Sequence, residues 1–567
     1  MIKIGELLVK KGFITAAQLD AALKESKRSG EILGTALVRL EFVTQEQLLE
    51  VLAEQLGLTF YRSLKELTVA PEVIKVVPVK LVWHYKFMPL KIKGNILTIA
   101  VSDPLAVWHS EDLKLQLGYD IEKVLASDKE ILTAVRRYYG VGAETVEEIL
   151  TQGDNKTEKD TQAYEEVEDL ERSAQDVSVI KLVNQILSEA ISSRSTDIHI
   201  EPYRNSVRVR YRIDGILYDM RVPEQIKYLH PAIVSRIKIL SNLNVVERRL
   251  PQDGRAIVKI KDKQVDLRIS IIPSIYGENV VIRILPVQLL FNLDDLGLFP
   301  HEAKKIEEMM SKPHGIIFLT GPTGSGKTTT LYACLSKLNK DAVKIITIED
   351  PIEYELPGVM QIQVKPEIGM TFANALRSIL RHDPDIMMVG EVRDLETAEL
   401  AIRTSLTGHL IFSTLHTNDA SSGATRLLDI GIEPYLVASS VNAFISQRLV
   451  RVICPACKEE MKDKSLLPEV FRSIKIFRGK GCENCKFVGY KGRTAIYEIL
   501  LIDDDIRALI LEKRSAAQIK KKARQMGFRT LFDSGLEKIK LGMTTPEEVL
   551  RVAELEEHDK ESGSDTP

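Results

Sequence analysis

A glycine-rich octapeptide near the middle of the chain constrains the fold more than any other feature. Residues 321–328 read GPTGSGKT, with an apolar run (316–319) before them and a helix-forming run (329–338) after them. Such glycines let backbone N–H groups face a phosphate, and the N-terminus of the following helix adds positive potential there. The pattern needs a strand, a tight loop and a helix in succession, so it predicts an α/β domain with a phosphate-binding loop.

The residues of this loop have predictable roles. The ammonium group of Lys327 is expected to reach the β- and γ-phosphates of ATP, and the hydroxyl group of Thr328 is expected to ligate Mg²⁺. A glycine-rich turn that arose by chance is the alternative, but it does not explain the flanking strand and helix. The expected ATP-binding residues are Gly321, Pro322, Thr323, Gly324, Ser325, Gly326, Lys327, Thr328 and Thr329.

Two more apolar runs end in carboxylates. Residues 345–348 lead into Glu349 and, four positions later, Glu353, and residues 386–390 lead into Glu391. Ligands of parallel sheets bind beyond the carboxyl ends of the strands, so acids at those ends are expected beside the phosphate loop. From position alone, ordinary solvated strand ends remain the alternative.

Three longer segments resemble the signature motifs of the secretion ATPase superfamily. Residues 348–354 (IEDPIEY) are similar to its Asp box, and residues 406–418 (LTGHLIFSTLHTN) are similar to its His box. Residues 383–394 (DPDIMMVGEVRD) resemble its atypical Walker B motif, which has Gly where other nucleotidases carry Asp. The resemblance extends over about residues 178–497 and implies a RecA-like P-loop ATPase core preceded by a PAS-like α/β domain.

The resemblance also implies roles for individual residues. Glu349 is expected to position the attacking water, with Glu353 as the second candidate, and Glu391 to hold Mg²⁺ directly or through water. His409 and His416 are expected to stand near the γ-phosphate. Without the resemblance, a histidine on an apolar strand is most simply a core residue.

Three segments before the loop, 197–201 (DIHIE), 210–215 (RYRIDG) and 252–255 (QDGR), also look like signatures of this superfamily. They imply that Arg210, Arg255 and Arg268 are candidates for stabilising charge on the γ-phosphate, in contacts that link domains of a homo-hexameric ring. The alternative is that these are strand-surface arginines paired with neighbouring acids.

Four of the five cysteines form two C-x₂-C pairs separated by 24 residues. Four thiolates in this spacing suit tetrahedral Zn²⁺ with no open position, which is a structural site. The segment resembles the tetracysteine module of type II secretion and type IV pilus assembly ATPases. Cys334 stands apart and is expected to be a small buried residue. The zinc ligands are expected to be Cys454, Cys457, Cys482 and Cys485.

The first sixty residues contain a repeat with a period of 29. Each copy carries a capping box, Thr15 with Gln18 and Thr44 with Gln47, so each copy is predicted to be a short helix, a turn and an amphipathic helix. The repeat resembles a domain that binds cyclic di-GMP in some relatives. Its motif arginine is replaced by Lys3 and Ile32, and one glycine by Glu41, so we expect docking to a membrane-anchored partner rather than tight nucleotide binding.

Charge and hydropathy limit the location and the partners of the chain. The net charge of −3 argues against bulk nucleic-acid binding. The sequence contains neither a signal-peptide core nor an apolar run of about 18 residues. We therefore expect a cytoplasmic protein that is peripheral at the inner membrane through secretion-platform partners.

The expected architecture is multidomain α/β. The order is a helical repeat domain (1–60), a small α/β domain (61–140), an acidic flexible linker (141–175), the PAS-like arginine-bearing domain (176–290), the RecA-like core (291–450), an inserted zinc module (451–497), a C-terminal helical region (498–555) and a disordered tail (556–567).

Taken together, these features predict a Mg²⁺-dependent ATPase, a translocase that powers type II protein secretion. A type IV pilus assembly ATPase is the alternative within the family. A nucleotide-regulated scaffold is the alternative from another class, and the intact Lys327, Glu349 and Glu391 argue against it.

Overall fold

The chain folds into two compact units, Met1–Pro286 and Val287–Pro567. The computed structural model describes residues 4–64, 67–103, 108–146, 149, 176–260, 263–286 and 292–555. The expected tail, 556–567, and most of the expected linker lie outside the described residues. Each unit has its own hydrophobic cores.

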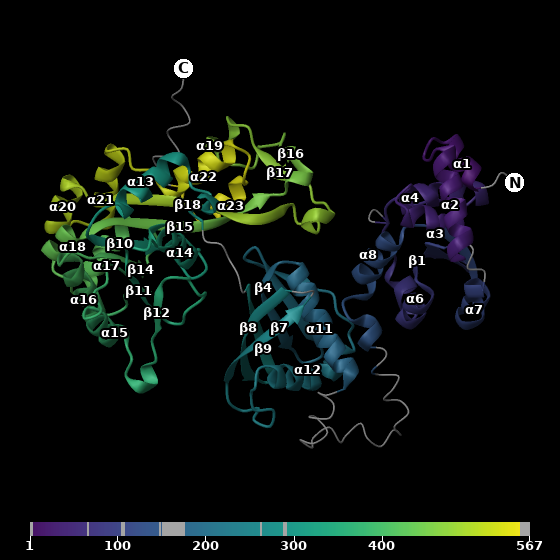
Figure 1. Ribbon diagram of the computed structural model, residues 1–567, viewed down its shortest axis with the longest axis horizontal. Coiled ribbons are helices and arrows are strands. Elements are labelled where there is room, and N and C mark those ends of the chain that lie inside the picture. The colour runs from purple at the N-terminus through teal and green to yellow at the C-terminus, as the bar shows by residue number, and fades with distance from the viewer. Residues whose placement is uncertain are drawn as a thin grey trace. The chain divides into compact units, whose positions relative to one another are not determined.

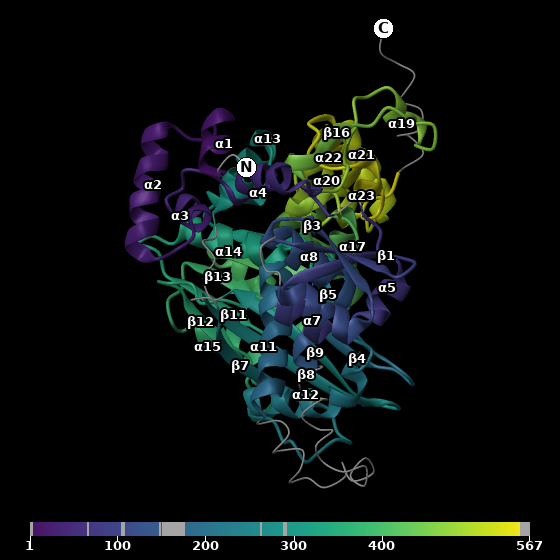
Figure 2. The same ribbon diagram turned by 90° about the vertical axis from the view of Figure 1, so that its right-hand side faces the viewer.

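Four helices at the start of the first unit confirm the predicted repeat, and they stand together as a group in Figure 2. Both capping boxes are present, one at Thr15 and one at Thr44. Gly5 of the first copy lies against Leu19, and Gly34 of the second lies against Leu48, so the two helix pairs pack alike. The helices are α1 (Ile4–Lys10), α2 (Ala16–Ser29), α3 (Leu33–Arg39) and α4 (Gln45–Leu56).

A small α/β domain follows. Its three strands lie in the order β1-β2-β3, with β2 antiparallel to β1 and parallel to β3. Apolar residues of the strands and of α8 form one core, which includes Leu97, Ile99 and Ile131. The elements are α5 (Pro71–Val76), α6 (Val79–Tyr85), β1 (Phe87–Lys93), β2 (Ile96–Val101), α7 (Trp108–Leu117), β3 (Asp120–Leu125) and α8 (Asp128–Tyr139).

The chain stays folded past position 141, where the linker was expected to begin. The backbone N–H of Val141 donates a hydrogen bond to the carbonyl of Arg221 (2.9 Å). Val146 is fully buried and packs in the core of the next domain with Leu182. The acidic composition of residues 141–175 predicted a linker. Val146 nevertheless packs in the core of the next domain.

An antiparallel sheet of six strands ends the first unit, in the order β6-β5-β4-β9-β8-β7. Alternate residues such as Ile198, Val209 and Ile282 bury one face of the sheet in a core shared with two helices. These helices, α11 and α12, lie beside the strands in Figure 1. The other face carries mainly charged side chains. The elements are α11 (Val177–Ser192), β4 (Ser195–Pro202), β5 (Val207–Ile213), β6 (Ile216–Met220), α12 (Ile226–Leu240), β7 (Gln252–Ile260), β8 (Lys263–Ser274) and β9 (Gly277–Pro286).

The second unit is built on a seven-stranded sheet in the order β12-β11-β13-β14-β10-β15-β18. The first six strands are parallel, and β18 is antiparallel to β15. The near-continuous apolar strands are buried on both faces, as expected for a parallel sheet. The strands are β10 (Gly315–Thr320), β11 (Ile345–Glu349), β12 (Met360–Gln363), β13 (Ile386–Val389), β14 (Leu410–Leu415), β15 (Val441–Ile453) and β18 (Tyr490–Leu501).

Helices cover both faces of this sheet. One core joins Ile317 and Leu319 of β10 to α13 (Pro300–Met310) and α14 (Lys327–Leu338). The opposite core joins Ile316 and Phe318 to six other helices. Figure 1 shows these helices beside the sheet. These are α15 (Phe372–Ile379), α16 (Leu395–Leu406), α17 (Ser421–Ile430), α18 (Pro434–Ser440), α20 (Asp504–Leu511) and α21 (Ala516–Gln525).

The cysteine-containing segment is inserted between β15 and β18. It contains β16 (Lys458–Glu460), α19 (Glu469–Arg472) and β17 (Phe477–Gly479). It shares a core with α22 (Leu531–Lys540) and α23 (Pro546–Leu550). Because β15 and β18 are strands of the main sheet, the ATPase core includes residues on both sides of the expected boundaries at 450 and 497.

Across the described residues of both units, none of the helices has the length and apolar character to span a bilayer.

Candidate nucleotide site and metal centre

The predicted phosphate loop connects the end of β10 to the start of α14. The Nζ atom of Lys327 donates hydrogen bonds to the carbonyls of Gly321 (2.7 Å) and Pro322 (3.1 Å). Gly324 has a φ of +80°, and the space beside its Cα is open. The buried hydroxyl of Ser325 has no hydrogen-bond partner among the described residues. A bound phosphate group would lie against the open backbone at Gly324 and accept a hydrogen bond from the Ser325 hydroxyl, so the loop fits ATP.

Charge at the loop also suits an anion. Burial first, and then the neighbouring positive charge of Arg448, lowers the pKa of Lys327 to about 8, while Glu391 acts in the opposite direction. Two buried cations beside one loop repel each other when no anion is present. A phosphate bound there would relieve that repulsion.

The carboxyl ends of β13 and β14 bring two more expected residues to this site. Glu391 follows β13, and its Oε1 lies 2.6 Å from Nη2 of Arg393. Its Oε2 lies 3.5 Å from Nε2 of His416, which follows β14. Lys327, Glu391 and His416 therefore meet at one edge of the sheet. Thr328, the other expected Mg²⁺ ligand, is half-buried in the first turn of α14.

Glu349 is in a different environment from the one expected for a residue that orients water. It is the last residue of β11, only 3% exposed, and its carboxylate accepts a hydrogen bond from the hydroxyl of Tyr332. The Thr347 hydroxyl (2.6 Å) and the Gln361 side-chain amide (3.0 Å) donate to its other oxygen. Glu353, four residues on, is half-buried. Because the carboxylate of Glu349 is committed to these three donors, we propose Glu353, the second candidate, ahead of Glu349 as the residue that orients water.

His409 is not found at the phosphate end of the sheet. It precedes β14, opposite Gly315 at the start of β10, and its Nδ1 lies 3.1 Å from the carbonyl of Thr404. His416 is seven positions further along the chain, so a strand rise of about 3.3 Å per residue places the two histidines about 20 Å apart. Within one chain, the expectation that both stand near the γ-phosphate is wrong because they lie at opposite ends of one strand.

The three expected arginines lie on the charged face of the first unit. Arg210 and Arg255 are paired with acids: Nη2 of Arg210 lies 2.6 Å from Glu201, and Nη2 of Arg255 lies 2.8 Å from Asp266. In the isolated chain, these two arginines are therefore paired with neighbouring acids, as the alternative interpretation expects. Arg268 stands directly across from Arg255 in the sheet.

Arg268 and Arg255 belong to a row of charged residues that crosses five strands. Cross-strand neighbours project from the same face of a sheet. Asp197 bridges two arginines of the row, with contacts of 3.4 Å to Arg212 and 3.1 Å to Arg283. In the order β5-β4-β9-β8-β7, the row is Arg212, Asp197, Arg283, Arg268 and Arg255.

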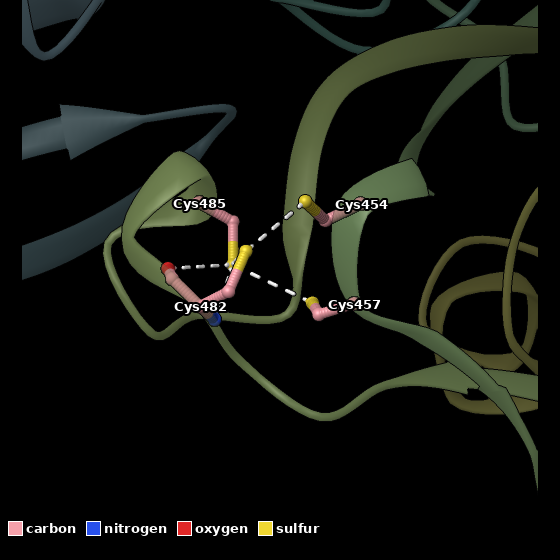
Figure 3. Close-up of side chains that lie close together, drawn as sticks. All are labelled: Cys454, Cys457, Cys482 and Cys485. Carbon is pink, nitrogen blue, oxygen red and sulfur yellow. Dashed lines mark hydrogen bonds between the residues drawn. The ribbon is translucent and has the colours of Figure 1, made fainter. Parts of the chain in front are cut away.

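The four paired cysteines converge as predicted, and Figure 3 shows their sulfur atoms around one point. The four Sγ atoms all lie within 4.8 Å of one another, and three of the separations are 3.8 Å. A tetrahedron with Zn–S bonds of about 2.3 Å has edges of about 3.8 Å, so the cluster fits Zn²⁺. It also fits a structural role, because four ligands fill the coordination shell.

Backbone N–H groups donate hydrogen bonds to two sulfur atoms of this cluster, those of Cys457 and Cys485. Burial acts to raise the pKa of the Cys485 thiol, but the N–H groups of Cys482 and Gly489 outweigh it and lower the pKa to about 7. Gly481 also donates to the Sγ atom of Cys457 (3.3 Å), but there burial and the neighbouring thiols outweigh this bond and raise the pKa of the Cys457 thiol to about 12. Cys334 is separate from the cluster: it is buried on α14, and burial raises the pKa of its thiol to about 12, as expected for an inert core residue.

Sequence reasoning missed the residues that surround the phosphate loop from other elements. Gln447 and Arg448 of β15, Arg393 after β13 and Tyr332 of α14 all contact the residues described above. One signal was available: Gln447 and Arg448 are adjacent polar residues in the middle of a mainly apolar strand.

Comparisons with known proteins agree with this site. The family described as "Type II/IV secretion system protein" matches residues 172–551. The MshEN domain family matches residues 56–145, which is the small α/β domain rather than helices α1 to α4.

Two relatives match almost the whole chain. The type IV pilus assembly ATPase PilB of Myxococcus xanthus is 42% identical over 97% of this chain and 98% of its own length. The type II secretion system protein E of Xanthomonas campestris is 39% identical over the same shares. A solved structure of the pilus retraction motor PilT with ADP is 26% identical over 66% of this chain and 98% of that one, with a TM-score of 0.44. With its phosphate loop, its Glu391–His416 pair and its tetracysteine cluster, the chain belongs to the family of type II/IV secretion system ATPases.

Proposed function

We propose that this chain hydrolyses ATP to power a cell-envelope machine that exports or assembles pilin-like subunits, and that the machine is a type II secretion system. The observation that carries the proposal is the meeting of Lys327, Glu391 and His416 at the carboxyl edge of the parallel sheet. That edge is where ligands bind in such folds.

The residues at this edge divide the chemistry between them. Lys327 and the loop amides bind the phosphates, and Thr328 and Glu391 would hold Mg²⁺, which neutralises developing charge when it is bound. Glu353 orients the attacking water, and His416 contacts the γ-phosphate. Glu349 positions the Asp box through its contacts with Tyr332 and Gln361.

The row of charged residues that contains Arg255 and Arg268, called the arginine row below, supports action in a homo-hexamer. The side chain of Arg255 is 68% exposed despite its ion pair with Asp266, so it is accessible to another molecule. An exposed ion pair contributes at most about 1 kcal/mol, so a phosphate can compete for the guanidinium. We place the chain in the cytoplasm, bound to the inner membrane through platform proteins.

A type IV pilus assembly ATPase is the second candidate, because the Myxococcus xanthus PilB is as similar to this chain as the type II protein. A gene replacement in the native host separates the two candidates. A strain that carries only Lys327→Ala is expected to lose secretion of its exported enzymes while it retains surface pili. Loss of pili with normal secretion would contradict the type II assignment and support the alternative.

The N-terminal helices are proposed to dock to a partner and to bind cyclic di-GMP weakly. Ile32 stands at a motif arginine position and is 70% exposed. Arg39, a basic residue nearby, is held by Glu25 (3.1 Å) and Glu31 (3.2 Å). Lys3 lies outside the described residues. The positive charge of Arg39 is thus committed to internal pairs.

A further inference from the structure

One strand that no motif includes lies against both ends of the phosphate loop. A Cβ atom on Gly321 would lie 2.8 Å from the Gln447 carbonyl oxygen and 2.9 Å from Nη1 of Arg448. A Cβ atom on Gly326 would lie 2.7 Å from Nε2 of Gln447. Gln447 also accepts a hydrogen bond from Thr330, in the first turn of α14 (2.7 Å). Strand β15 is therefore the surface on which the loop rests.

Arg448 extends this contact to the segment that follows β14. Its Nη1 donates to the carbonyl of Gln447 (3.0 Å), and its Nη2 donates to the carbonyl of Asn418 (2.5 Å). Asn418 comes two residues after His416. The guanidinium group of Arg448 thus lies against the phosphate loop at Gly321, and it is hydrogen-bonded to Asn418 in the segment that contains His416.

The setting of Arg448 is unusual for a cation. It is only 8% exposed, and both of these acceptors are main-chain carbonyls. Asp419 and Glu498 are its charged neighbours, and Lys327 carries a like charge close by. Desolvation of a guanidinium is costly, so a group that only filled space here would be better apolar. The planar guanidinium group of Arg448 can donate in two directions at once. The ammonium group of a lysine cannot do this in the same geometry.

We propose that Arg448 is a positioning residue of the ATPase site, which holds the phosphate loop and the His416 segment in a fixed relation by bridging them. The inference rests on the proposed function. Phosphate held by Lys327 then faces His416 and Glu391 at the distance that hydrolysis needs. Without the bridge, ATP still binds to the loop, but the two halves of the site are misaligned.

Kinetics of purified full-length variants test this proposal. Arg448→Gln is expected to lower kcat by about 10- to 100-fold, the size of effect that small misplacements produce. The Kd for a fluorescent ATP analogue should change less than about threefold, because the loop amides and Lys327 remain. Arg451→Gln is the matched control: Arg451 lies three residues further along β15 and pairs with Glu548 (2.8 Å), away from the loop. It should lower the melting temperature and leave kcat unchanged.

A double-mutant cycle adds a measurement that general destabilisation would not affect. If Arg448 acts through the His416 segment, Arg448→Gln in a His416→Ala background should lower kcat much less than it does alone. Additive losses in log kcat would overturn the proposal. Arg448→Lys keeps the charge but not the fork, so it also should have a lowered kcat, and it replaces the glutamine variant if that variant does not fold. Wild-type kcat in the lysine variant would overturn the bridge.

Failure of this inference can be told apart from failure of the proposed function. Normal kcat in Arg448→Gln beside an active wild-type chain overturns only the role of Arg448. An inactive wild-type chain, measured as a full-length oligomer with MgATP, overturns the ATPase proposal and this inference with it.

Discussion

The hydroxyl group of Tyr332, on the helix that follows the phosphate loop, donates a hydrogen bond to the carboxylate of Glu349 at the end of β11. Burial first, and then the charge of Glu349, raises the pKa of Tyr332, so the tyrosine stays a hydrogen-bond donor. With Thr347 and Gln361 as further donors, Glu349 joins α14 to the Asp box. This is the observation behind our proposal that Glu353, in the same motif, orients the water instead.

Glu353→Gln is expected to stall hydrolysis while ATP remains bound. Loss of a group that orients or deprotonates water typically lowers kcat by about 10²- to 10⁴-fold. Glu349→Gln instead turns one of the two acceptor oxygens into a donor that faces either Tyr332 or the pair of Thr347 and Gln361, at a cost of about 1–3 kcal/mol. Single-turnover kinetics and the melting temperature of both variants check this. A stable, ATP-bound and inactive Glu349→Gln beside an active Glu353→Gln would restore the order expected from the motif.

Zinc removal is expected to loosen the inserted module and leave the ATPase core folded. The module has few buried apolar residues besides Phe471 and Ile476, so thiolate coordination should supply much of its stability. We expect one zinc ion per chain, and a large rise in hydrogen exchange over residues 454–489 on chelation. Cys454→Ser should reproduce the effect, and Cys334→Ser should retain its zinc. Unchanged protection after complete removal of the metal would contradict a structural role.

The arginine row predicts that hydrolysis depends on assembly. If Arg255 acts on the nucleotide of a neighbouring copy, the specific activity of the wild-type chain should rise with protein concentration. Arg255→Gln should lower the plateau by about 10³-fold or more, the effect of losing an arginine finger. Arg204→Gln, an exposed arginine in the turn after β4, is the control. Constant specific activity in a chain that stays monomeric would remove support for action between copies.

Cyclic di-GMP is expected to bind weakly. The missing motif arginines remove bidentate contacts that are each worth about 1.5–3 kcal/mol. Glu41 adds a negative charge, and it adopts a φ of +58°, where glycine is favoured. Calorimetric titration of the full-length chain should give a Kd well above micromolar. The double variant Ile32→Arg/Glu41→Gly should bind more tightly. A submicromolar Kd for the wild-type chain would contradict the expectation.

Local patterns were sufficient to predict the phosphate loop, the helix caps and the cysteine cluster. Each depends on residues close in sequence, or on a spacing that only one geometry satisfies. Glu349 lies at the end of its strand as expected, but its three hydrogen-bond donors were not predicted, because a motif does not give side-chain contacts. The placement of His409 was missed because the motif does not give strand polarity. His416 follows the C-terminal end of β14, at the site, whereas His409 precedes its N-terminal end, at the opposite edge of the sheet. Arg448 was missed because its partners, Gly321 and Asn418, are distant in sequence.

ATP turnover by Lys327→Ala tests the central claim most directly. Among the described residues, Lys327 donates hydrogen bonds only to carbonyls of its own loop, so its loss should remove phosphate binding without unfolding the unit. Lys340→Ala, an exposed lysine just after α14, is the matched control. The account predicts phosphate release by the wild-type chain and by Lys340→Ala, and none by Lys327→Ala with unchanged circular dichroism. Wild-type turnover by Lys327→Ala would contradict the assignment of the site.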